Sequence, residues 1–289
     1  MFSDIKIRTI SALGLGLICF TCIYIGNFYL KYLLFSILII LNFEWMRIIS
    51  QEQWIIRGLI ASFFSTFILF TDSYTSFDLL LIISGAITIA AYSSFFKLSV
   101  FWSCFGFIYI LLSINFFGYV RSLEEGLISV LLILSTIVIS DISGYLFGKY
   151  LSGPKIFKKI SPNKTYSGFF ASIIISVIWF SLLSILYSRH EPIIFILIGF
   201  FITIFSIMGD LFISYLKRKA NLKESGFILP GHGGFFDRAD SILSVFFVFL
   251  TITILPDMPK CIIKDLLFDR FIIIYFALRK TVITLQSLT

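Results

Sequence analysis

Residues 192–216 read PIIFILIGFFITIFSIMGDLFISYL, an apolar run in which Asp210 is the single charged residue. A helix needs about 20 apolar residues to cross the hydrocarbon core of a bilayer. A strand of a membrane barrel instead needs about ten residues of alternating polarity, which this run does not show. The stretch therefore predicts a transmembrane helix that carries a carboxylate where an ionised group is costly.

Similar apolar runs recur along the whole chain. Hydrophobic residues make up 58% of the sequence and charged residues 13%, against roughly 25% charged in a soluble domain. A soluble protein of this size could not bury so much apolar surface. We therefore predict an all-α, polytopic helical membrane protein with about nine transmembrane helices, near residues 10–26, 28–43, 55–71, 77–96, 99–118, 125–148, 168–188, 192–216 and 241–256.

The domain organisation follows from the same pattern. We expect residues 1–256 to form a single transmembrane domain, with the chemistry concentrated in residues 141–240. Residues 257–289 mix charged and apolar side chains and form a charged C-terminal tail. An interrupted tenth span, a membrane-surface helix and a poorly ordered segment are all compatible with the composition of this tail.

The net charge indicates the orientation of the chain in the membrane. Lysine and arginine number 23 against 16 acidic residues. In a membrane protein this excess fits the positive-inside rule, so no nucleic-acid partner is expected. With the N-terminus and its Lys6 and Arg8 in the cytoplasm, the basic residues gather in loops on the cytoplasmic side. Both long loops, 149–167 and 217–240, then lie there.

Zinc chemistry is not predicted. Cys19 and Cys22 form a C-x-x-C pair inside the first apolar run, where we interpret them as lipid-facing or helix-facing packing residues. The chain has two His, no second cysteine pair and no H-E-x-x-H motif.

Two intramembrane carboxylates are candidates for function. Asp210, Ser214 and Lys217 share one helical face, because they are spaced i, i+4 and i+7. The alternative for this stripe is a buried ion pair that stabilises helix packing. Asp141 is followed by glycines at i+3 and i+7, which fit either a site or the close approach of another helix.

A glycine-rich loop precedes the last predicted helix, and residues 230–240 read PGHGGFFDRAD. Its glycines permit positive φ and expose backbone N–H groups to an anion. Asp237 and Asp240 share a face at i, i+3 and offer the oxygen ligands that Mg²⁺ prefers beside substrate phosphates. The alternatives are that Asp240 caps a helix beginning at Ser241, and that His232 is an ordinary loop residue.

The other long loop is rich in lysine. Residues 155–168 read KIFKKISPNKTYSG. These lysines fit either attraction to anionic lipid or the binding of nucleotide phosphates.

Taken together, these motifs resemble those of the phosphatidate cytidylyltransferase (CDP-diacylglycerol synthase) family. Residues 214–218 (SYLKR), Lys223, 229–234 (LPGHGG) and 237–240 (DRAD) follow the family signature S-x-x-K-R, Lys-Asp, P-G-H-G-G and D-R-x-D. Residues 209–211 (GDL), 161–165 (SPNKT) and the D-x-x-x-Y segment 141–145 also agree. The chain departs from the pattern at Ile142, Ser143, Tyr166, Ser167, Ile213 and Glu224.

The resemblance implies transfer of a cytidylyl group from CTP to phosphatidate, giving CDP-diacylglycerol and pyrophosphate, with Mg²⁺ as cofactor. It implies an integral membrane enzyme of the bacterial inner-membrane type, a site on the cytoplasmic face and a possible homodimer. The implied catalytic residues are Asp210, Lys217 and Asp237, and the implied metal ligands are Asp210, Asp237 and Asp240. The implied substrate-binding residues are Ser161, Lys164, Ser214, Arg218, His232, Gly233, Gly234 and Arg238.

Two other functions remain alternatives. Another CTP-dependent lipid phosphotransferase, such as a polyprenol kinase, also needs carboxylates at the membrane face. A secondary transporter could use intramembrane Asp residues as ion sites, but it would need neither the glycine-rich loop nor phosphate-binding lysines.

Overall fold

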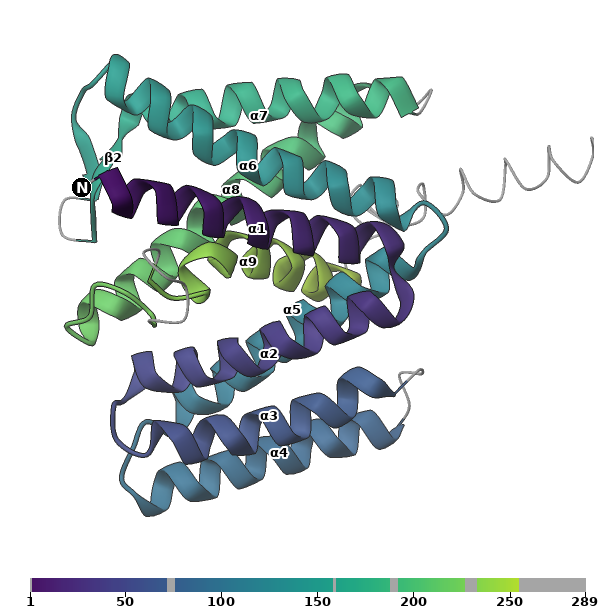
Figure 1. Cartoon of the computed structure of the whole chain (residues 1–289), viewed down its shortest axis with the longest axis vertical. Helices are drawn as coiled ribbons and strands as arrows, with labels where there is room; N and C mark the ends of the chain where they lie inside the picture. The colour runs from purple at the N-terminus through teal and green to yellow at the C-terminus, as the bar shows by residue number, and fades with distance from the viewer. Residues whose placement is uncertain (1, 72–75, 158–159, 188–191, 227–232, 255–289) are drawn as a thin grey trace, which may run out of the picture. The chain divides into compact units, whose positions relative to one another are not determined.

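The computed structural model describes residues 2–71, 76–157, 160–187, 192–226 and 233–254 (Figure 1). Within them the all-α prediction is confirmed, because nine helices are joined by short loops and one small hairpin. The elements are α1 (Phe2–Ile25), α2 (Asn27–Ile49), α3 (Trp54–Phe70), α4 (Ser76–Phe95), α5 (Val100–Ser122), α6 (Gly126–Tyr150), β1 (Lys155–Phe157), β2 (Ser161–Thr165), α7 (Tyr166–Tyr187), α8 (Pro192–Lys219) and α9 (Phe236–Ile254).

Most of these helices are long and apolar enough to cross a membrane. Six meet both conditions, and they are α2, α4, α5, α6, α7 and α8. Shorter apolar stretches lie in α1, at Leu13–Ile25, and in α3. The last helix, α9, begins at Phe236 and not at residue 241, so its first two turns carry charged side chains. The chain is therefore a multi-pass membrane-type protein.

The described residues divide into two compact units, and the first contains parts of residues 1–130, 155–164 and 205–247. In this unit α2 packs against α3 and α5, α3 against α4, and α4 against α5. Figure 1 shows these four helices side by side. Helix α1 contacts α2.

The core of the first unit is built around Trp45 of α2. Its indole ring is fully buried and packs against aromatic rings from α5, α8 and α9 at 5.7–6.2 Å between centroids. The indole nitrogen donates a hydrogen bond to the Trp102 carbonyl oxygen at 2.9 Å. A side chain at Gly106 would overlap the indole, so α5 needs a glycine at this position. Four helices therefore meet around one side chain.

A buried arginine closes the C-terminal end of α2. Arg57 is fully buried, and its Nη2 atom donates to the carbonyl oxygens of Met46, Ser50 and Glu52 at 2.9–3.2 Å. Its Nη1 atom donates to Ser103 Oγ at 3.0 Å. The last carbonyls of a helix have no intrahelical partner, and here the guanidinium supplies one. Arg57 thereby fixes the turn between α2 and α3 and ties it to α5.

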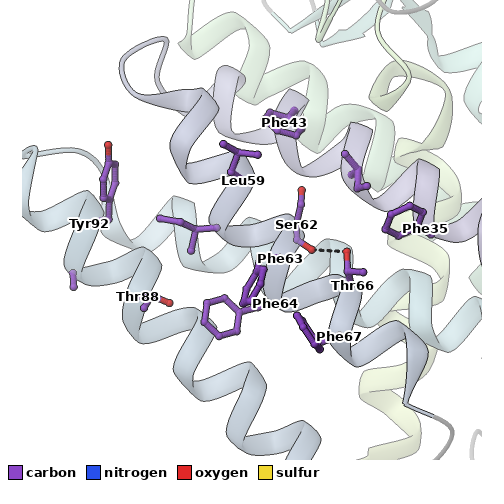
Figure 2. A pocket seen from close by; sticks show the side chains of 13 residues that line it. Phe35, Phe43, Leu59, Ser62, Phe63, Phe64, Thr66, Phe67, Thr88 and Tyr92 are labelled. Atoms are coloured by element: carbon purple, nitrogen blue, oxygen red, sulfur yellow. Dashed lines mark hydrogen bonds between the residues drawn. The ribbon is translucent and has the colours of Figure 1, made fainter.

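The first unit also carries an open apolar groove of about 860 Å³ on α2, α3 and α4. Figure 2 shows Phe35 and Phe43 of α2, Phe63 and Phe67 of α3, and Tyr92 of α4 along it. Its lining contains hydroxyl groups but no charged side chain. Phosphate chemistry needs cations, so this groove does not fit a phosphate site.

The second unit contains parts of residues 131–154, 165–204 and 248–254. In it α6 and α7 approach closely, because a Cβ at Gly144 or Gly148 would lie 3.6 Å from the backbone of Gly168. Trp179 Nε1 of α7 donates to Ser135 Oγ of α6 at 3.1 Å. The glycines that follow Asp141 are therefore explained by helix packing. The Asp141 side chain itself is exposed.

We expect Gly106→Ala to lower the thermal stability of the protein in detergent, because the added methyl group overlaps the Trp45 ring. Overpacking of this kind costs about 1–3 kcal/mol. Gly16→Ala on α1 is the matched control, since a Cβ there meets nothing within 4 Å. Equal melting temperatures for the two variants would contradict the packing described around Trp45.

Candidate active site

The β1–β2 hairpin places Lys164 beside the carboxylate of α8. Lys164 Nζ lies 2.5 Å from Asp210 Oδ2, and both side chains remain about one-third exposed. Arg218, in the last turn of α8, donates from Nε to the Ile160 carbonyl oxygen at 3.4 Å. Ser161 is half-buried at the start of β2. The lysine-rich loop and the intramembrane aspartate are thus parts of one site.

The predicted polar stripe on α8 is present. Ser214 Oγ donates to Asp210 Oδ1 at 3.3 Å, as the i, i+4 spacing predicts. Lys217, one turn further, does not pair with Asp210 as the ion-pair alternative implied. It reaches the first turn of α9 instead.

Lys217 and Asp237 form the most buried ion pair of the site. Lys217 Nζ lies 2.5 Å from Asp237 Oδ1, and the two side chains are 11% and 15% exposed. The backbone N–H of Ser225 donates to Asp237 Oδ2 at 3.0 Å. Both oxygens of Asp237 therefore accept a hydrogen bond, and its orientation is fixed from two sides.

Asp240 does not cap α9, because the helix begins four residues earlier, at Phe236. It is 5% exposed and accepts a hydrogen bond from the Ser241 N–H at 2.8 Å. Among the described residues, no three Asp, Glu, His or Cys side chains gather as a metal-binding group. The role of Asp240 as a third ligand stays a prediction.

The carboxylates of Asp210 and Asp237 supply oxygen atoms of the type that binds Mg²⁺. Each carboxylate oxygen has about two acceptor positions, and each of these four oxygens has one described polar partner. Mg²⁺ is usually held by one or two carboxylates together with waters and substrate phosphates. Mg²⁺ binding by the two aspartates together stays a prediction.

The two described glycines of the loop have a structural explanation. Gly233 has φ of 81°, which disfavours any other residue, and its Cβ position faces the Glu224 side chain at 3.2 Å. A Cβ at Gly234 would overlap Ser225 Oγ and lie 2.7 Å from Glu44. Contact of these glycines with a phosphate stays a prediction. The Arg218 and Arg238 side chains are exposed, and His232 lies outside the described residues.

Glu44 of α2 is a residue of the site that the sequence patterns missed. Its side chain is 3% exposed and accepts hydrogen bonds from the Phe235 N–H at 2.9 Å, the Phe236 N–H at 2.7 Å and Ser225 Oγ at 2.9 Å. The predicted helix ended at residue 43, which left Glu44 in a loop, whereas α2 continues to Ile49. A signal was available, since Glu44 is the only acidic residue of α2.

The fold and the site together define an integral membrane enzyme in which two lysine–aspartate pairs involve β2, α8 and α9. The model of the Cytidylyltransferase family matches residues 6–255. The chain belongs to this family.

Three curated relatives are similar in sequence to parts of this chain. A Bacillus subtilis protein named phosphatidate cytidylyltransferase is 29% identical over 255 residues, which cover 84% of this chain and 95% of that protein. A Rickettsia typhi protein of the same name is 32% identical over 62% of this chain and 82% of its own length. A third, from Rickettsia bellii, is 41% identical over 36% of this chain and 48% of its own length.

The Lys217–Asp237 pair predicts coupled effects on stability. We expect Lys217→Met and Asp237→Asn each to lower the melting temperature in detergent, because each leaves a buried charge without its partner. The double variant should be more stable than the sum of the two effects predicts, by an interaction free energy of about 1–3 kcal/mol. Additive effects would show that the pair does not contribute to stability.

Proposed function

We propose that the chain transfers a cytidylyl group from CTP to phosphatidate, giving CDP-diacylglycerol and pyrophosphate. The observation that carries the proposal is the pairing of Lys164 with Asp210 and of Lys217 with Asp237, within the residues that match the family. The names of the relatives from Bacillus and Rickettsia support the choice of phosphatidate as the acceptor lipid.

The charges of the reactants explain why the site needs cations. A phosphomonoester carries about −1.5 to −2 charges near neutral pH, and CTP is also anionic. The lipid phosphate attacks the α-phosphorus of CTP, a new P–O bond forms, and the bond to the pyrophosphate leaving group breaks. Lys164, Lys217, Arg218 and Arg238 hold and orient the phosphates for this displacement.

No general base is required, because the attacking phosphate oxygen is already ionised near neutral pH. His232 then serves in binding, together with Ser161, Ser214, Gly233 and Gly234. Mg²⁺ held by Asp210 and Asp237 would neutralise charge on the nucleotide phosphates, with Asp240 assisting directly or through water. Each lysine also keeps its carboxylate in place for this role.

The location of the reactants places the site at a membrane surface. Phosphatidate brings acyl chains that belong in the bilayer, whereas CTP is soluble in the cytoplasm. The positive-inside count supports a cytoplasmic position for the loops of the site. Association into a homodimer is part of the proposal through the family resemblance.

The decisive experiment supplies purified protein in detergent with CTP labelled at the α-phosphate, phosphatidate and Mg²⁺. We expect the label to enter the lipid fraction. Asp237→Asn should reduce this transfer at least about 100-fold, because it removes a carboxylate proposed to hold Mg²⁺ and leaves Lys217 without its partner. Glu125→Gln, at an exposed position, is the control for the same chemical change and should keep wild-type activity.

The same assay distinguishes the competing functions. A CTP-dependent polyprenol kinase would transfer label from the γ-phosphate of CTP to a polyprenol and leave the α-label in water-soluble CDP. A transporter would give no labelled lipid with either substrate. Either result, or full activity of Asp237→Asn, would contradict the proposal.

The charged tail is expected to be dispensable for the reaction. The family match ends at residue 255, and residues 255–289 lie outside the described residues. Deletion of residues 261–289 should therefore leave kcat within about twofold of the full chain, since the residues assigned to the site all precede the tail. An inserted but inactive truncated protein would show that the tail contributes to the site.

A further inference from the structure

The first turn of α9 is held by a carboxylate from a distant helix. The Phe235 carbonyl oxygen accepts the first hydrogen bonds of α9, from Arg238 and Ala239, so Phe235 is the N-cap residue. The N–H groups of an N-cap and of the first helical residue have no partner within the helix. Glu44, which is 191 residues before Phe235, accepts one hydrogen bond from each of them.

The same carboxylate holds the segment that faces this turn. Ser225 donates from its hydroxyl to Glu44 Oε2, and from its backbone N–H to Asp237 Oδ2. Gly226 lies directly against Glu44, because a Cβ there would come within 2.7 Å of the Glu44 Cδ atom. Glu44 therefore connects α2, the Ser225–Gly226 segment and the start of α9.

Asp237 is the second residue of the helix that Glu44 caps, and one of its oxygens is bonded to the segment that Glu44 holds. Its other oxygen pairs with Lys217. Two of the three connections that fix Asp237 thus run through Glu44, which is itself too buried to contact substrate. A reacting group displaced by about 1 Å can cost about 100-fold in rate.

We propose that Glu44 is a positioning residue of the active site, which orients Asp237 by accepting hydrogen bonds from Ser225 and from the first turn of α9. The inference rests on the proposed function for the reaction that it serves. It adds α2, a helix without a family motif, to the elements that make the site.

A carboxylate suits this position better than an amide. The two oxygens of an ionised carboxylate only accept hydrogen bonds, so they can accept all three, from Ser225, Phe235 and Phe236. In Glu44→Gln one of the two acceptors becomes an NH₂ group that faces either the Phe235 N–H or both the Phe236 N–H and Ser225 Oγ. The negative charge that the N-terminus of α9 favours is also lost.

The test compares Glu44→Gln and Ser225→Ala with the full wild-type chain in detergent. Glu52→Gln makes the same change as Glu44→Gln at an exposed position and serves as the matched control. Two measurements are made on each protein. The first is kcat and KM for CTP and phosphatidate, and the second is hydrogen–deuterium exchange of residues 233–240.

We expect kcat to fall about 100-fold in Glu44→Gln and about tenfold in Ser225→Ala, with KM for phosphatidate within about threefold of wild type. Amide exchange should become faster at Phe235 and Phe236 in Glu44→Gln, while helices distant from Glu44, such as α4, keep wild-type exchange. Glu52→Gln should match wild type in both measurements.

Several outcomes would overturn the inference. Faster exchange at Phe235 and Phe236 with unchanged kcat would make Glu44 a purely structural residue. Unchanged exchange in Glu44→Gln would mean that the hydrogen bonds to α9 do not hold it. If Glu44→Gln fails to insert, normal kcat in Ser225→Ala contradicts the proposal. A wild-type protein without cytidylyl transfer would instead refute the proposed function, which is a different result.

Discussion

A carboxylate buried among apolar helices must have hydrogen-bond donors, and this constraint organises the first unit around Glu44. Burial of an unpaired charge costs several kcal/mol, so the chain has to bring donors to it. The donors are two backbone N–H groups and one hydroxyl from a part of the chain that follows α8. Their positions fix where α9 begins, and the start of α9 fixes where Asp237 lies. The neighbouring Trp45 packs against rings of α5, α8 and α9, so polar and apolar contacts of α2 act on the same helices.

Local periodicity predicted the helices well because a membrane imposes a length on each apolar run. It also predicted the Asp210–Ser214 contact, which depends on neighbours one helical turn apart. Because the prediction relied on apolar runs, it placed the start of α9 too late. The charged sequence around Asp237 reads as a loop by hydropathy, whereas in the structure it forms the first turns of the helix. Glu44, Lys217 and Ser225 stabilise those turns, and none of them is close in sequence.

The partners of the site residues required the structure. The sequence predicted that Lys217 lies on the same helical face as Asp210. It did not predict that Asp210 forms its ion pair with Lys164, or that Lys217 pairs with Asp237. The glycine motif predicted contact with an anionic ligand, which stays a prediction, whereas the structure places Gly234 against the carboxylate of Glu44. The motifs therefore named the candidate residues, whereas the contacts among them include partners as much as 192 positions apart in the sequence.

The open groove on α2, α3 and α4 has a practical consequence for handling the protein. Its lining is mostly apolar and includes no charged side chain, so in a bilayer it suits a hydrocarbon chain better than a polar ligand. Solubilisation replaces lipid tails with detergent tails of another length, so the amphiphile that meets this apolar surface changes. Phe43 lines the groove and immediately precedes Glu44, so the groove and the buried carboxylate belong to the same helix, α2.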